Sequence, residues 1–117
     1  MNAVALNNLY EKELRLFLAE DKSQERWQHL ERLHIIGQQF LFKHFQVHFL
    51  MLRQAYVDKN ISEILGQLLR LSLVFPGHLF GKLPIGNIGS SRVSAFKRMA
   101  IPEDLKKYFD QNGDQNE

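Results

Sequence analysis

The chain has 117 residues, no cysteine and a formal net charge of +2, and 44% of its residues are hydrophobic. This balance predicts one globular domain, and the lack of cysteine excludes disulfides, thiolate metal sites and a cysteine nucleophile. The N-terminus does not resemble a secretory signal and no run of about 18 apolar residues occurs. We therefore expect a cytoplasmic protein with no membrane span.

Apolar residues recur at helical spacing in four successive stretches. These stretches are residues 2–20, 23–37, 40–58 and 60–75, and Pro76–Gly77 is expected to end the last one. Short polar turns separate them, which favours antiparallel neighbours. The sequence thus predicts an all-α fold of about four helices in two antiparallel hairpins, with a tetratricopeptide-like arrangement.

The third and fourth helices are the most apolar. Along the third, one stripe is formed by Phe42, Phe45, Phe49, Leu52 and Tyr56. This wide apolar arc predicts that the third helix is the most buried. The leucine-rich fourth helix, with an exposed stripe, is a candidate face for a homodimer.

Residues 76–100 are rich in glycine and are predicted to form an irregular segment, followed by a short last helix. The single helical domain is expected to span residues 1–109, and the polar tail 110–117 is expected to be disordered. No Asp or Glu occurs from Ile64 to Pro102. The basic residues there are expected either to pair with acidic residues of the N-terminal helices or to attract an anionic partner.

The most informative polar residues lie on the second and third helices. Glu31 and His34 are three residues apart, and His44 and His48 are four apart, so each pair projects from one side of its helix. Folding the hairpin at Gly37 brings the two pairs to the same level along the axes of the two antiparallel helices. Three imidazoles and a carboxylate suit Zn²⁺ and also iron, nickel, copper or manganese.

Two simpler interpretations of these four residues remain open. They can form a structural polar network of hydrogen bonds and an ion pair, or they can be unrelated surface residues, because such short motifs often occur by chance. His29 lies one residue away from the apolar stripe and is a weaker candidate ligand.

The Gly-rich run LPIGNIGSSRVSAF is a second candidate site, with Asn87, Arg92 and Ser94 as the residues of a ligand loop. It lacks the glycine spacing of nucleotide-binding loops, and no relay supports a serine hydrolase. The alternative is that this segment only packs across the helices. Specific nucleic-acid binding is not expected, because no recognition helix is apparent.

Four runs of the sequence resemble a bacterial family known as domain of unknown function 3703. They are LERLHIIGQ, HFQVHFLML, LGQLLRL and GKLPIGNIGSSRVSAFKRMAIPEDL. The resemblance covers Trp27 to Leu105. The residues that match the family pattern are Glu31, His34, Gly37, Gln38, His44, His48, Gly86, Asn87, Gly89, Ser94, Ala95 and Phe96. The chain departs from it at Leu33, Ile36, Ile88, Arg98 and Ala100. The resemblance implies no activity.

Together these observations predict a small cytoplasmic binding protein with a transition-metal site, for Zn²⁺ or another metal, formed by Glu31, His34, His44 and His48. The alternative is a tetratricopeptide-like module that binds a protein partner or self-associates, with the same residues as a structural network. A metal-dependent enzyme with Glu31 as its base is a third, less favoured hypothesis.

Overall fold

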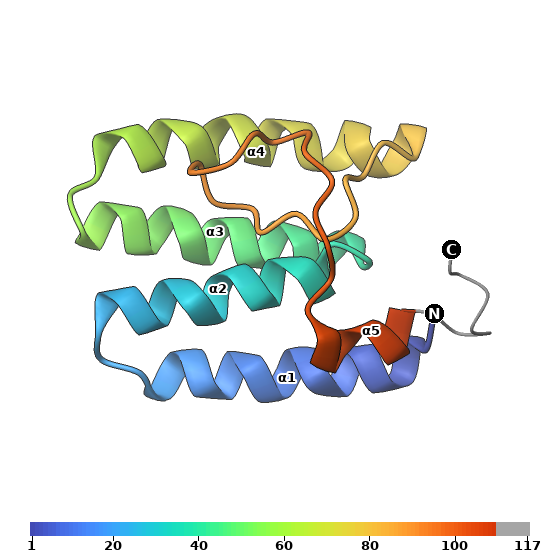
Figure 1. Cartoon of the computed structure of the whole chain (residues 1–117). Coiled ribbons are helices and arrows are strands. Elements are labelled where there is room, and N and C mark those ends of the chain that lie inside the picture. Colours follow the sequence, from blue (N-terminus) through green and yellow to red (C-terminus); the bar gives the residue numbers. More distant parts are fainter. Residues whose placement is uncertain (110–117) are drawn as a thin grey trace.

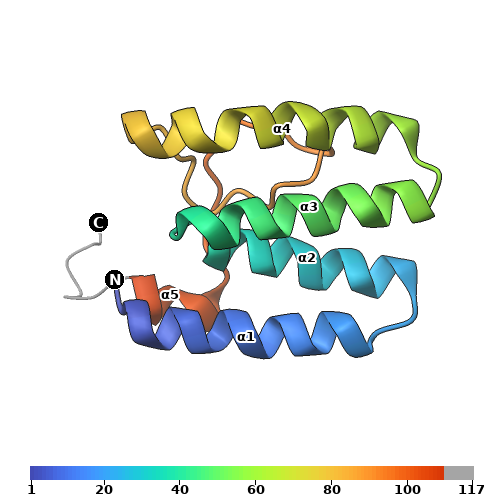
Figure 2. The ribbon, with the colours of Figure 1, turned by 180° about the vertical axis from the view of Figure 1, so that it is seen from behind.

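The computed structural model describes residues 1–109, and within them the chain forms five helices (Figures 1 and 2). They are α1 (Ala3–Ala19), α2 (Ser23–Gly37), α3 (Leu41–Val57), α4 (Ile61–Phe80) and α5 (Glu103–Phe109). Helices α1 to α4 pack in chain order as antiparallel neighbours, and α5 packs against α1. The predicted all-α fold is confirmed, including the short last helix. The polar tail 110–117 lies outside the described residues.

Side chains cap the starts of α1 and α4, whereas the starts of α2 and α3 have no side-chain cap. The side chains of Asn2 and Asn60 accept hydrogen bonds from backbone N–H groups in the first turns of α1 and α4. The expectation that α4 ends at Pro76–Gly77 is wrong, because α4 continues to Phe80. It ends where Gly81 adopts a left-handed conformation with φ of 68°. The irregular segment therefore begins at residue 81 instead of 76.

The apolar core is built by α1, α2 and α3. Buried side chains such as Leu6, Tyr10, Leu33 and Met51 form it, and Leu105 of α5 closes one end. Each fully buried aliphatic side chain of this kind contributes roughly 1.5–3 kcal/mol to folding. Within residues 1–109, α4 supplies no residue to this cluster, so a different kind of contact must hold α4 in place.

The buried face of α4 is polar. Glu63, Gln67, Arg70 and Val74 are its buried residues, at the spacing of one helical face. Seven of its large apolar side chains are exposed, namely Ile61, Leu65, Leu68, Leu69, Phe75, Leu79 and Phe80. Although α4 is long and leucine-rich, no helix in the described part of the chain meets the length and hydropathy needed to span a membrane.

Helix α3 is rotated relative to the expectation from its apolar stripe. Phe42 and Tyr56 are 82% and 74% exposed, and Phe49 is exposed as well. The buried residues of α3 are instead His44, Val47, His48, Met51, Gln54 and Ala55. The histidine face of α3 therefore points inward and much of the phenylalanine stripe faces solvent, which sets the geometry of the site.

Residues 81–102 form an irregular segment that crosses α4 and α3 before it descends to α5 beside α1 (Figure 1). The side chain of Asn87 organises it: Nδ2 donates to the backbone oxygens of Ser94 and Lys97, and Oδ1 accepts from Gly89 N–H. Arg92 anchors the segment to α2 through a two-pronged ion pair with Glu31. That pair agrees with the expectation that basic residues here neutralise acids of the N-terminal helices.

Candidate metal centre

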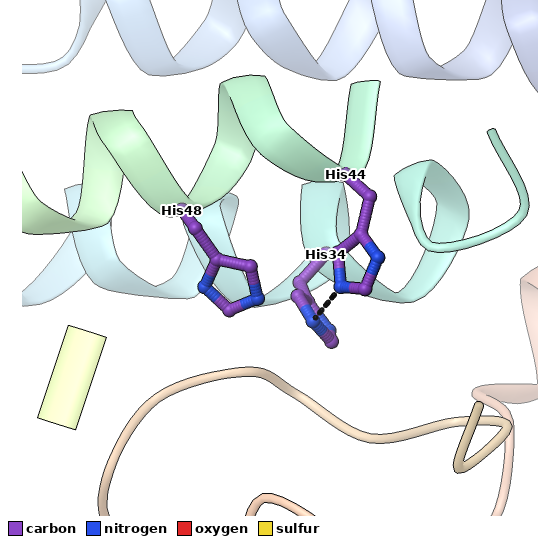
Figure 3. Close-up of side chains that lie close together, drawn as sticks. All are labelled: His34, His44 and His48. Carbon is purple, nitrogen blue, oxygen red and sulfur yellow. Dashed lines mark hydrogen bonds between the residues drawn. The ribbon is translucent and has the colours of Figure 1, made fainter. Parts of the chain in front are cut away.

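Three histidines from two helices meet at the buried junction of α2 and α3. His34 of α2 and His44 and His48 of α3 are all buried, and their candidate ligand atoms lie within 4.8 Å of one another. Figure 3 shows the three rings on the same side of these helices, directed toward the irregular segment. The Nε2 atoms of His34 and His44 are 3.1 Å apart. Three of the four predicted ligands are therefore brought together.

The Nδ1 atoms of two of these histidines have acceptors that determine their tautomers. His34 Nδ1 lies 2.7 Å from the backbone oxygen of Asn87, and His48 Nδ1 lies 2.7 Å from Gln67 Oε1. A carbonyl oxygen only accepts, so Nδ1 carries the proton in both neutral rings. Nε2 of each ring is then unprotonated and carries a lone pair, which is the form that binds metals.

His44 contacts a further histidine, His78 in the last turn of α4. His44 Nδ1 is 2.9 Å from His78 Nε2. Without a metal, His44 Nε2–H donates to the lone pair of His34, and His44 Nδ1 accepts from His78. An exchange of tautomers at His44 and His78 would free His44 Nε2 for a metal while Nδ1–H donates to His78. The expectation that α4 ends at Pro76–Gly77 left His78 unnoticed.

Burial keeps the three imidazoles neutral. Loss of hydration is the main cause that lowers the pKa of His44 to about 3 and that of His48 to about 4. Burial also holds the pKa of His34 well below 6.5, and repulsion between protonated forms of His34 and of its neighbours His48 and His44 lowers it further. All three rings are consequently uncharged at neutral pH, as ligation requires.

A chain of hydrogen bonds holds Gln67 in the orientation that His48 needs. Gln67 Nε2 donates to Glu63 Oε2 and to the backbone oxygen of Gly89, so its Oε1 faces His48. The Glu63 carboxylate in turn accepts from the N–H and hydroxyl of Ser91. The polar face of α4 therefore positions the histidine cluster, in the way outer partners orient metal-binding imidazoles in proteins.

Glu31 and the candidate loop residues lie outside this cluster. The Glu31 carboxylate accepts from Ser90 Oγ and pairs with Arg92. Asn87 contributes a backbone oxygen to His34, while the exposed Ser94 uses its hydroxyl to accept from Phe96 N–H. His29 pairs with Glu13 on the other side of α2. Each predicted residue beyond the three histidines thus has a role within the fold.

Gln67, Arg70 and His78 were not predicted as site residues. The available signal was a polar stripe at helical spacing, formed by Glu63, Gln67 and Arg70, on a helix that is otherwise rich in leucine. An amphipathic helix ordinarily turns its polar face to solvent, so the stripe by itself predicts a solvated surface, and the structure places it inward instead.

These features define an all-α protein with a buried three-histidine cluster enclosed by α2, α3, α4 and the irregular segment. The chain belongs to the family described as protein of unknown function DUF3703, whose model matches residues 4–109. This confirms the resemblance seen in the sequence. Comparison with curated proteins and with solved structures found no match.

Gly89 is predicted to be essential to the cluster. It has φ of +83°, and a Cβ atom there would overlap the His34 ring. Gly89→Ala should reduce the free energy of unfolding by about 2 kcal/mol or more, combining backbone strain with the clash. Gly81→Ala is the matched control, since Gly81 has φ of +68° but open space around it. Urea denaturation of both variants separates the two effects, and equal losses would contradict the role assigned to Gly89.

The metal-free protein is predicted to lose stability in mild acid. The folded-state pKa values of His44 and His48 lie below the unfolded value of 6.5, so the unfolded chain binds extra protons between pH 6.5 and about 4. Stability is therefore complete above pH 6.5 and falls as the pH decreases. At pH 5 each such histidine costs about 2 kcal/mol.

Denaturation of the metal-free wild type and His48→Gln at pH 7 and pH 5 checks this prediction. The variant should lose about 2 kcal/mol less between the two pH values, since it lacks one of the histidines that resist protonation. An unchanged pH dependence would contradict the assignment of His48 as a buried neutral group.

Proposed function

We propose that this is a small transition-metal-binding protein in which His34, His44 and His48 are the protein ligands. Zn²⁺ is the favoured ion because imidazole nitrogen is among its usual ligands, and copper, nickel or iron are the alternatives. The lack of cysteine fits a reducing compartment, and a cytoplasmic location is part of the proposal.

The observation that carries the proposal is the assignment of hydrogens in the cluster. Two Nδ1–H groups donate outward, to Asn87 and Gln67, and leave two Nε2 lone pairs facing inward. In the metal-free protein the lone pair of His34 accepts from His44 Nε2–H, whereas Nε2 of His48 has no hydrogen bond within residues 1–109. A purely structural network has no need of an inward lone pair without a donor, whereas a metal site requires one.

The spacing of the ligand atoms supports the same conclusion. Tetrahedral zinc with bonds of about 2.0–2.1 Å places its nitrogens roughly 3.3 Å apart. The Nε2 atoms of His34 and His44 are 3.1 Å apart, and the complete set lies within 4.8 Å. Small rotations of the rings would close the rest of the site.

Glu31 is not included among the proposed ligands. Its carboxylate is neutralised by Arg92 and bonded to Ser90, so it would have to break an ion pair to reach the histidines. The same contacts remove the support for Glu31 as a catalytic base. We therefore propose binding, without a catalytic role for this residue.

Metal analysis of untagged protein tests the proposal. Wild-type protein equilibrated with Zn²⁺ and freed of excess should retain one ion per chain. His44→Ala/His48→Ala should retain none, because one imidazole cannot hold the ion. His29→Ala is the matched control: it removes a helical histidine that pairs with Glu13 outside the cluster, and it should retain one ion. Substoichiometric metal in the wild type, or full retention in the double variant, would refute the proposal.

A second candidate function, binding of a protein partner or a second copy of the chain, is favoured by the exposed apolar face of α3 and α4. Phe49, Leu52, Tyr56, Ile64 and Leu68 line a shallow depression there. Soluble monomers rarely expose a large contiguous apolar surface, so such a face often marks an interface.

Light scattering coupled to size exclusion tests self-association. If the face is a homodimer interface, wild-type protein should elute with twice the mass of one chain, and Leu68→Asp should return it to a monomer because a charge would be buried. Ser62→Asp, on an exposed position of the same helix, serves as the control. A monomeric wild type at high concentration would rule out the homodimer.

A further inference from the structure

A cavity of about 190 Å³ lies directly against the three histidines. Its walls are mostly apolar and include Leu73, Val74, Leu83 and Ala95. The exposed residues Phe80, Lys82 and Phe96 also line it, so it reaches the surface between the end of α4 and the irregular segment. An apolar cavity of about 150 Å³ is large enough for benzene, which means that this one has room for a small organic molecule.

The charge around the cavity is unbalanced once a metal is present. No Asp or Glu is among the described residues that line it, while Arg70 and Lys82 are. A divalent ion held by three neutral imidazoles would keep its full charge in a largely buried place. Buried charge is costly unless it is paired. The missing partner is a negative group, and the fourth position of a three-histidine site is open to receive one.

Arg70 strengthens this preference for an anion. Only 8% of its surface is exposed, and two of its guanidinium nitrogens donate to the backbone oxygens of Gly66 and Val93. Its buried Nε has no hydrogen-bond partner within residues 1–109. The guanidinium is thus held as a fixed positive charge beside the cavity, with one donor still unused.

We propose that the cavity binds a small monocarboxylate, with the carboxylate at the fourth coordination position of the metal and the apolar body against Leu73, Val74 and Phe80. This inference rests on the proposed metal site. A carboxylate supplies the negative charge that would balance the positive charges of the metal and Arg70. The apolar walls select an anion with a hydrocarbon body over inorganic phosphate or sulfate, which would leave those walls without apolar contacts.

Spectroscopy of the Co²⁺-loaded, untagged protein tests the proposal, with butyrate as the probe. The visible bands of bound Co²⁺ report its ligands directly. Butyrate should change them saturably and bind about tenfold tighter than acetate, because two more methylene groups are buried. Butyramide, which has nearly the same shape without the charge, should leave the bands unchanged at the same concentrations.

Two variants locate the binding. Ala95→Leu should fill part of the cavity and weaken butyrate at least tenfold while Co²⁺ stays at one ion per chain. Phe80→Ala changes a rim residue that is 69% exposed, so it removes little buried apolar surface from the fold. It should weaken butyrate several-fold and leave acetate unaffected, so it keeps the test decisive if Ala95→Leu does not fold.

The outcomes separate the two proposals. If Co²⁺ binds stoichiometrically but butyrate leaves its bands unchanged, the carboxylate site is refuted and the metal site stands. If acetate and butyrate bind equally, or if neither variant weakens butyrate, the assignment of the cavity is refuted. If Co²⁺ and Zn²⁺ both fail to bind, both proposals fail.

Discussion

The structure depends on keeping three imidazoles neutral and oriented inside a small helical protein. Each ring needs a partner for Nδ1, because an unpaired polar group in a buried place costs free energy. The backbone oxygen of Asn87 serves His34, Gln67 serves His48, and His78 serves His44. These partners come from α4 and from the irregular segment, so the hydrogen-bonding needs of the rings determine where both must lie.

This requirement explains the unusual orientation of α4. A leucine-rich helix would ordinarily turn its apolar face to the core, yet α4 turns Glu63, Gln67 and Arg70 inward and leaves several leucines exposed. The inward face satisfies the cluster and binds the irregular segment through Ser91 and Val93. The apolar surface left outside is the consequence, and it gives the protein a second surface with potential for binding.

The histidine cluster and the adjoining cavity share the same charged surroundings. The imidazoles are neutral, Arg70 is cationic and buried, and the Glu63 carboxylate on the same face of α4 is already engaged with Gln67 and Ser91. If the cluster holds a divalent ion as proposed, these neutral and positive surroundings would leave the charge of the ion unbalanced. An external anion would balance it, and the apolar walls of the cavity would restrict what that anion can be.

By itself the sequence determined where the helices lie in the chain and how far along the helix axes the histidines stand from the turn. Apolar spacing and polar turns marked the helices, and the position of the turn near Gly37 placed His34 level with His44 and near His48. Both follow from local chemistry and chain geometry, which depend only on neighbouring residues.

Only the tertiary structure decided which sides of the helices face one another. Glu31 and His34 lie one turn apart along α2 and about 60° apart around it, which is enough for His34 to join the cluster while Glu31 meets Arg92 and Ser90. The rotation of α3 and α4 depends on partners more than ten residues away, among them Asn87 and Gly89 in a segment without periodicity. No local pattern encodes those contacts, so the membership of the histidine cluster, the contact of His78 with His44 and the cavity emerge only when the whole chain is folded.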